Sequence, residues 1–178
     1  VWRDSSRGGP SERLAVGCAM IATDHPVIRV LLIDDSPGDR RLIREMLAKS
    51  RDVSFDVQCA ETLAAGLQRA SENEPDVLLI DLGLPDSKGL GTFERAHQAA
   101  SRLPIVVLTD LNDEAVAVQA VRGGAQDYLM KSELDGQTLS RSLRYAIERK
   151  HSHRELLRAK QAAEEASRDG ISVEVIDL

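Results

Sequence analysis

The chain has 178 residues, of which 42% are hydrophobic and 29% charged, and its formal net charge is −6 at pH 7. This length suits one well-buried domain with an extension and is short for two ordinary domains. The hydrophobic fraction excludes wholesale disorder. The acidic balance argues against a nucleic-acid-binding surface, because a phosphate-binding face needs clustered Lys and Arg.

The cysteines and the apolar runs indicate where the protein works. Cys18 and Cys59 do not make a disulfide framework, so we expect a reduced, cytoplasmic setting. No apolar run approaches the roughly 20 residues that a membrane helix needs. We therefore expect the partners to be proteins, with no nucleic acid and no membrane among them.

Composition divides the chain into three parts. Residues 1–26 are rich in Ser, Gly, Arg and Pro without any period, which is typical of a disordered arm. Met20 raises the hypothesis that the residues before it are an upstream extension. A domain is expected over 27–148, and a helical extension with a short tail over 149–178.

Short apolar runs alternate five times with stretches of helical period from residue 27 onward. The first, third and fourth runs are continuously apolar, as expected for central parallel strands covered on both faces. The sequence therefore predicts an α/β fold with a doubly wound, five-stranded parallel sheet and helices on both faces. The predicted strands are 28–33, 54–60, 77–80, 105–108 and 128–130.

Capping residues support the predicted helices. Ser36 is a suitable N-cap before Pro37 at the first helical position, and the glycines at 123–124 end the fourth helix. Asp39 and Asp86 are interpreted as a helix-cap residue and a turn residue, without a role in a site.

Chemically active side chains follow four of the predicted strands. Asp34 and Asp35 end the first strand, Asp81 the third and Thr109 the fourth, and the fifth runs into Lys131. In such sheets, ligands bind beyond the carboxyl ends of the strands. We therefore expect three carboxylates, a hydroxyl and an ammonium to meet at one edge of the sheet.

Carboxylates this close together need a counter-charge. Each close pair repels by roughly 4 kcal/mol at an effective dielectric constant near 20. A hard divalent cation relieves this repulsion, and oxygen ligands with room for water suit Mg²⁺. A Mg²⁺ site with Lys131 and Thr109 beside it is suited to receive a phosphoryl group, with a carboxylate as the attacking group.

These residues, in this order and each at a strand end, carry a resemblance to a known family. Residues 27–148 resemble the receiver domain of bacterial response regulators, of the type often linked through a long C-terminal helix to kinase or cyclase modules. The resemblance implies a flavodoxin-like sheet with strand order 2-1-3-4-5. The motifs that carry it are Asp34-Asp35, Asp81 within "DLGLPDSKG", Thr109, Tyr128 and Lys131.

The resemblance also implies a role for each residue. Asp81 is expected to accept a phosphoryl group from a histidine kinase or histidine phosphotransfer protein. Asp35 would bind Mg²⁺ directly, Asp34 through water, and Gly83 through its backbone carbonyl. Lys131 would hold a phosphoryl oxygen. The protein would then be a phosphoacceptor with at most slow self-dephosphorylation, not an enzyme.

The resemblance further implies a switch, and the sequence departs from the family at two positions. Thr109 and Tyr128 would turn inward after phosphorylation and change a surface that an unknown downstream protein reads. Ser132 follows Lys131 where many receivers have proline, so a cis peptide is not assumed. Asp110 stands where the family carries a small residue, which predicts slow phosphoryl loss or weak labelling by small phosphodonors.

The last helix is predicted from near residue 137 to about 168, with a charged segment beyond 149. A helix this long is typical of a coiled coil, although a lone, fraying helix is an alternative. We expect a single-domain receiver that acts through protein contacts, with a homodimer joined along this segment as one arrangement.

Two other functions stay open. A Mg²⁺-dependent phosphohydrolase of haloacid-dehalogenase type also uses an aspartyl phosphate. That class requires Asp-x-Asp after its first strand, whereas this chain has the adjacent pair Asp34-Asp35. A degenerate receiver could act as a binding scaffold, although every residue expected for phosphorylation is present.

Overall fold

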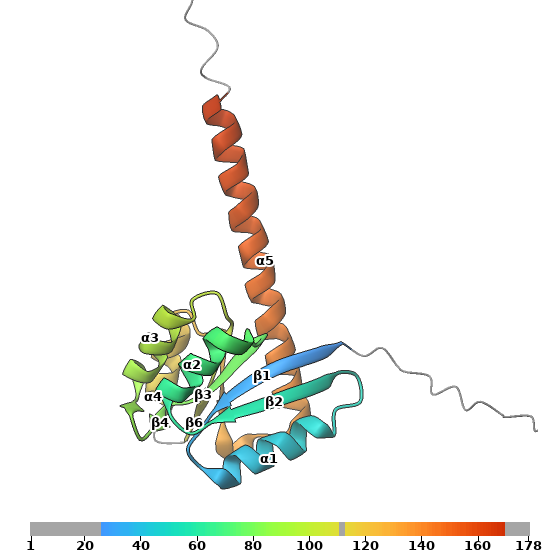
Figure 1. Cartoon of the computed structure of the whole chain (residues 1–178), viewed down its shortest axis with the longest axis vertical. Helices are drawn as coiled ribbons and strands as arrows, with labels where there is room; N and C mark the ends of the chain where they lie inside the picture. Colours follow the sequence, from blue (N-terminus) through green and yellow to red (C-terminus); the bar gives the residue numbers. More distant parts are fainter. Residues whose placement is uncertain (1–25, 111–112, 170–178) are drawn as a thin grey trace, which may run out of the picture.

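The computed structural model describes residues 26–110 and 113–169. It contains a five-stranded parallel sheet with the strand order β2-β1-β3-β6-β7 (Figure 1). The strands are β1 (Val27–Ile33), β2 (Ser54–Ala60), β3 (Val77–Asp81), β6 (Ile105–Thr109) and β7 (Asp127–Met130). With the short β4 and β5 set aside, this is the predicted order 2-1-3-4-5, so the doubly wound, flavodoxin-like fold is confirmed.

Helices cover both faces of the sheet. The described α-helices are α1 (Pro37–Ala48), α2 (Leu63–Asn73), α3 (Leu90–Ala99), α4 (Glu114–Arg122) and α5 (Gly136–Asp169). On one face, α2, α3 and α4 enclose a core that includes Ile33 and Phe93. On the other face, α1 and α5 enclose a core that includes Leu32 and Leu143. Because alternate side chains of a strand point to opposite faces, consecutive residues such as Leu32 and Ile33 enter different cores.

In the register of the sheet, the carboxyl ends of neighbouring strands lie side by side. Every residue of β3 and β6 is buried, as their continuous apolar runs predict. Ile33 at the end of β1 lies opposite Ile80, and Thr109 at the end of β6 lies opposite Met130. Residues that directly follow these strands therefore meet at one edge of the sheet.

The predicted helix ends are confirmed where capping residues mark them. Ser36 is the N-cap of α1, its hydroxyl accepting a hydrogen bond from the Asp39 backbone N–H at 3.3 Å, and Pro37 follows at the first helical position. Gly123 ends α4, and Gly124 has a φ of 114°, which a residue with a side chain rarely adopts.

A small hairpin after β3 was not predicted. Strands β4 (Gly83–Leu84) and β5 (Ser87–Lys88) pair antiparallel around a turn that contains Asp86. The Asp86 carboxylate accepts hydrogen bonds from the backbone N–H groups of Leu63 and Ala64, both at 2.9 Å. Asp86 is therefore a turn residue, as predicted, and it also caps the N-terminus of α2.

Helix α5 extends far beyond the sheet (Figure 1). Its 34 residues span about 50 Å at 1.5 Å per residue, and residues 151–168 are exposed along their whole length. The prediction of a long C-terminal helix is confirmed. None of the described helices has the length and apolarity that a membrane-spanning segment requires. The expectations for residues 1–25 and 170–178 lie outside the described residues.

Candidate functional site

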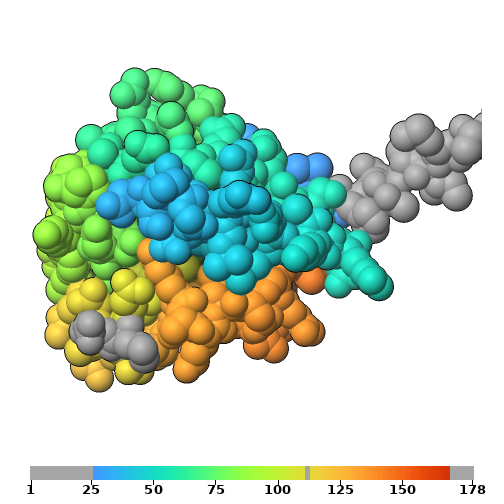
Figure 2. Space-filling model, turned by 90° about the horizontal axis from the view of Figure 1, so that it is seen from below, coloured from blue at the N-terminus to red at the C-terminus, as the bar shows by residue number. Residues whose placement is uncertain are grey.

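Three aspartates meet at the carboxyl ends of β1 and β3. One carboxylate oxygen from each of Asp34, Asp35 and Asp81 lies within 4.8 Å of the others. Asp34 and Asp81 are buried, and Asp35 is exposed. Figure 2 views this end of the molecule, where the blue segment of α1 borders the orange segment that follows β7. The structure thus brings together acids that lie far apart in the sequence.

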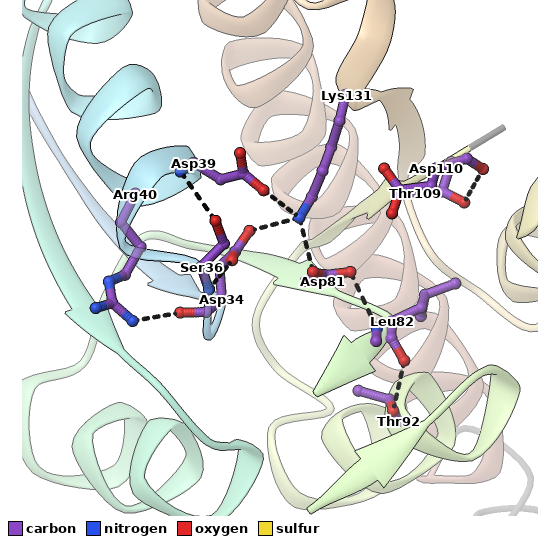
Figure 3. Close-up of polar contacts among 11 residues, drawn as sticks. Asp34, Ser36, Asp39, Arg40, Asp81, Leu82, Thr92, Thr109, Asp110 and Lys131 are labelled. Carbon is purple, nitrogen blue, oxygen red and sulfur yellow. Dashed lines mark hydrogen bonds and ion pairs between the residues drawn. The ribbon is translucent and has the colours of Figure 1, made fainter. Parts of the chain in front are cut away.

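The Lys131 ammonium lies among three carboxylates (Figure 3). Its Nζ atom is 2.7 Å from Asp81 Oδ2, 2.8 Å from Asp39 Oδ2 and 2.9 Å from Asp34 Oδ2. Burial by itself lowers the pKa of Lys131, but its contacts with Asp39, Asp81 and Asp34 outweigh burial and raise the pKa above the ordinary lysine value. Lys131 therefore carries a positive charge over the whole physiological pH range.

Asp39 is the site residue that sequence reasoning missed. Its interpretation as a helix-cap residue is wrong, because Ser36 caps α1 and the Asp39 carboxylate instead binds Lys131. The feature of the sequence that could have indicated this role is the position of Asp39 relative to the acidic pair. Asp39 stands four residues after Asp35, in the first turn of a helix that begins at the site.

Asp34 is the most deeply buried of the acids. Burial raises its pKa above the ordinary aspartate value, while the contact with Lys131 and a hydrogen bond from the Ser36 backbone N–H act in the opposite direction. Asp34 Oδ2 is ion-paired with Lys131, but within the described residues it receives no well-directed hydrogen bond. A buried oxygen with unused acceptor capacity, beside two more carboxylates, fits a hard cation such as Mg²⁺.

Side chains of α1 and its neighbours hold the loop that carries the acidic pair. Asp34 Oδ1 accepts a 2.8 Å hydrogen bond from the Ser36 backbone N–H. Arg40 donates a 2.8 Å hydrogen bond to the Asp34 backbone carbonyl (Figure 3). Arg40 also pairs with Glu61 at 2.8 Å. These contacts keep the two acidic residues at the end of β1 in place without neutralising them.

The loop after β3 is anchored in a similar way. Asp81 Oδ1 accepts a 3.0 Å hydrogen bond from the Gly83 backbone N–H. The buried Thr92 hydroxyl donates to the Leu82 carbonyl at 3.4 Å. Gly83 is exposed and lies beside Asp81, so its position is compatible with the ligand role expected from the sequence.

Thr109 and Tyr128 lie near the site but contact other groups. The Thr109 hydroxyl is buried and donates a 3.1 Å hydrogen bond to the carbonyl of Asp110 (Figure 3). The Tyr128 hydroxyl donates to Glu114 Oε1 of α4 at 3.5 Å. Lys131 and Ser132 are joined by a trans peptide, since the described residues contain no cis peptide bond.

Fold and site together define a flavodoxin-like α/β protein with an acidic, lysine-bearing site at its strand ends. A family model of the response regulator receiver domain matches residues 30–144. The chain therefore belongs to the response regulator receiver domain family, as the sequence motifs predicted.

Individual relatives agree with this assignment. The KDP operon transcriptional regulatory protein KdpE of Escherichia coli (strain K12) is 37% identical over 123 residues, which cover 69% of this chain and 52% of KdpE. The photosynthetic apparatus regulatory protein RegA of Rhodovulum sulfidophilum is 40% identical over 102 residues, 57% of this chain and 54% of RegA. The chain thus spans about half the length of these relatives.

Solved structures show the same fold. A response regulator receiver domain protein from Clostridium thermocellum superimposes with a TM-score of 0.62 at 27% identity, covering 70% of this chain and 97% of that one. The receiver domain of an HD domain-containing protein from Pseudomonas fluorescens Pf-5 has a TM-score of 0.63 at 26% identity, covering 76% and 98%.

Proposed function

We propose that this protein is a two-component response regulator that accepts a phosphoryl group on Asp81 in a Mg²⁺-dependent reaction. The donor is a phosphohistidine on a histidine kinase or histidine phosphotransfer protein. The observation that carries this proposal is the 2.7 Å contact of Lys131 with Asp81, beside two further aspartates. A nucleophile, a metal site and a fixed cation are the parts that phosphoryl transfer needs.

The proposed step uses the Asp81 carboxylate as nucleophile. An Asp81 oxygen attacks phosphorus, a P–O bond forms, and the P–N bond to the donor imidazole breaks. The imidazole leaves with the electron pair and takes up a proton. Lys131 donates hydrogen bonds to a phosphoryl oxygen. Bound Mg²⁺ would be held by Asp34, Asp35, Asp81 and the Gly83 carbonyl, and it would supply positive charge for the phosphoryl oxygens.

The proposed output is a change of surface around α4 and β7. The Thr109 hydroxyl now donates to the Asp110 carbonyl, and a phosphoryl group on Asp81 would offer it a stronger, charged acceptor. Tyr128 would exchange its contact with Glu114 for the space that Thr109 vacates. A downstream protein then reads the altered face. Cys59 is a free thiol, in keeping with the cytoplasmic location that this function requires.

Helix α5 supports a homodimer as part of this proposal. One heptad frame along this helix holds small or apolar residues at every position except Tyr145 and Arg149, and it includes Leu156 at 68% exposure. In a parallel pair, Glu148 faces His153 of the second copy, and Glu155 faces Lys160. An antiparallel pair would instead place glutamates opposite each other. The frame consists of residues 145, 149, 152, 156, 159, 163 and 166.

The two alternative functions predict different behaviour. A phosphohydrolase of haloacid-dehalogenase type would turn over small phosphate esters repeatedly, whereas the adjacent pair Asp34-Asp35 does not match its Asp-x-Asp pattern. A degenerate scaffold would accept no phosphoryl group, although every residue expected for phosphorylation is present and Asp34, Asp35 and Lys131 lie beside Asp81.

Intact mass after incubation with Mg²⁺ and acetyl phosphate tests the proposal. We expect the wild-type chain to gain one phosphoryl unit, and Asp81→Asn to gain none while keeping its circular dichroism spectrum. Asp86→Asn is the matched control, because this nearby aspartate lies on the same loop outside the acidic cluster. An unlabelled wild-type chain would favour the scaffold, and multiple turnover of p-nitrophenyl phosphate would favour the hydrolase.

A further inference from the structure

The contacts of Lys131 leave little capacity for a phosphoryl group. Its ammonium donates hydrogen bonds to Asp39 at 2.8 Å and to Asp81 at 2.7 Å, and it is ion-paired with Asp34 at 2.9 Å. An ammonium has three N–H donors. Asp39 and Asp81 each accept one of these N–H groups, and Asp34 lies 2.9 Å from the ammonium without a well-directed hydrogen bond. An incoming phosphoryl oxygen therefore competes with the carboxylates that already surround Lys131.

Burial identifies the carboxylate that can leave. The Asp34 side chain is fully buried at the end of β1, so its displacement would disturb the core. Asp81 is the proposed phosphoacceptor and is only 11% exposed. Asp39 lies in the first helical turn of α1 with 39% of its side chain exposed, and a rotation of this side chain takes its carboxylate into water.

We infer that Asp39 is a positioning residue that holds Lys131 in the unphosphorylated protein and competes with the incoming phosphoryl group for it. This inference rests on the proposed phosphorylation of Asp81. Asp39 acts through Lys131 and, in the structure, lies outside the cluster formed by Asp34, Asp35 and Asp81. Release of Lys131 by Asp39 is then one of the events that phosphorylation requires.

The charge of Asp39 should have opposite effects on two measurable quantities, the affinity for Mg²⁺ and the rate of phosphorylation. The four carboxylates of the site, with Asp39 included, and the Lys131 ammonium together carry a formal charge of −3. The fourth carboxylate, Asp39, attracts a cation and engages Lys131, which would otherwise pair more fully with the metal-binding acids. The same carboxylate repels an approaching phosphoryl group. Asp39 should therefore strengthen Mg²⁺ binding and slow phosphorylation.

The test compares Asp39→Asn with the wild-type full chain. Titration calorimetry with Mg²⁺ measures cation affinity, and acetyl phosphate at saturating Mg²⁺ measures the labelling rate of Asp81. We expect Asp39→Asn to bind Mg²⁺ about two- to fivefold more weakly and to be labelled about three- to tenfold faster. Asp39→Glu keeps the charge and can still reach Lys131, so both values should return toward those of the wild type.

A control variant separates this contact from a general charge effect. Glu45→Gln removes one negative charge from the same helix, where Glu45 pairs with Arg41 at 2.8 Å instead of with Lys131. It should change neither value. Equal or slower labelling of Asp39→Asn, or an identical response of Glu45→Gln, overturns the inference. If the wild-type chain is not labelled at all, the proposed function itself fails, and this result is distinct from the other two.

Discussion

Lys131 and Asp81 are fifty residues apart in the sequence, yet Lys131 Nζ lies 2.7 Å from Asp81 Oδ2. Lys131 directly follows β7 and Asp81 ends β3, and β6 lies between these two strands in the sheet. The contact therefore spans an intervening strand, and its geometry depends on the register of three strands. Because of this contact, both the proposed chemistry of the site and the stability of the protein depend on the Lys131 ammonium.

Removal of the Lys131 ammonium should destabilise the metal-free protein. We expect Lys131→Met to lower the free energy of unfolding by about 3 kcal/mol, because three carboxylates lose a largely buried counter-charge. Added Mg²⁺ should recover part of this loss. Urea unfolding with and without MgCl₂ measures both effects. Arg158→Met, on the exposed part of α5 and outside the heptad frame, is the control and should be neutral.

Asp110 should control the fate of the phosphoryl group. It is exposed and directly follows Thr109, whose hydroxyl donates a hydrogen bond to the Asp110 backbone carbonyl, so it adds a negative charge next to a residue of the proposed site. We expect Asp110→Ala to be labelled faster by acetyl phosphate and to lose the phosphoryl group faster, because repulsion of anions and crowding of water are both removed. Timed intact-mass spectra report both rates. If both stay at their wild-type values, Asp110 has no such role.

Asp86 should stabilise the protein in a pH-dependent way. Partial burial raises its pKa, but the hydrogen bonds from Ala64 and Leu63 outweigh burial and lower the pKa below the ordinary aspartate value. A carboxylate with a lowered folded-state pKa stabilises the fold above its unfolded pKa and loses this effect as the pH falls through the folded value.

The corresponding variant is Asp86→Ala. At pH 7 we expect it to lose about 1 kcal/mol of stability, the usual magnitude for a lost helix cap. This difference from the wild type should shrink below about pH 4, where the wild-type carboxyl group takes up a proton. Thermal unfolding over a pH series provides the measurement. Asp52→Ala, on an exposed turn, is the matched control, and an equal loss there would contradict the capping role.

The exposed stripe of α5 should determine whether the chain dimerises. Leu156 lies within the heptad frame and Leu157 lies outside it, although both are exposed. We expect Leu156→Glu to abolish the dimer and Leu157→Glu to leave it intact, because only the first change places a charge in the helix interface. Light scattering over a concentration series, with and without phosphorylation, gives the mass. A wild-type monomer under every condition would refute the dimer.

Local patterns in the sequence were sufficient for most of the fold. The continuously apolar runs predicted the central strands to within one residue at each end, because a parallel strand covered on both faces must be apolar throughout. Ser36 and the glycines at 123–124 marked two helix ends, since capping depends on neighbouring residues alone. The hairpin of β4 and β5 was missed because strands of two residues leave no detectable period.

The convergence of Asp34, Asp81 and Lys131 could also be anticipated, because alternating strands and helices place every strand's carboxyl end at the same edge of the sheet. The tertiary structure alone decided which side chain contacts which. Asp39 binds Lys131 and Asp86 caps a distant helix. Such contacts depend on side-chain rotamers and on how far one helix lies from another strand, and neither quantity repeats along the chain as hydrophobicity does.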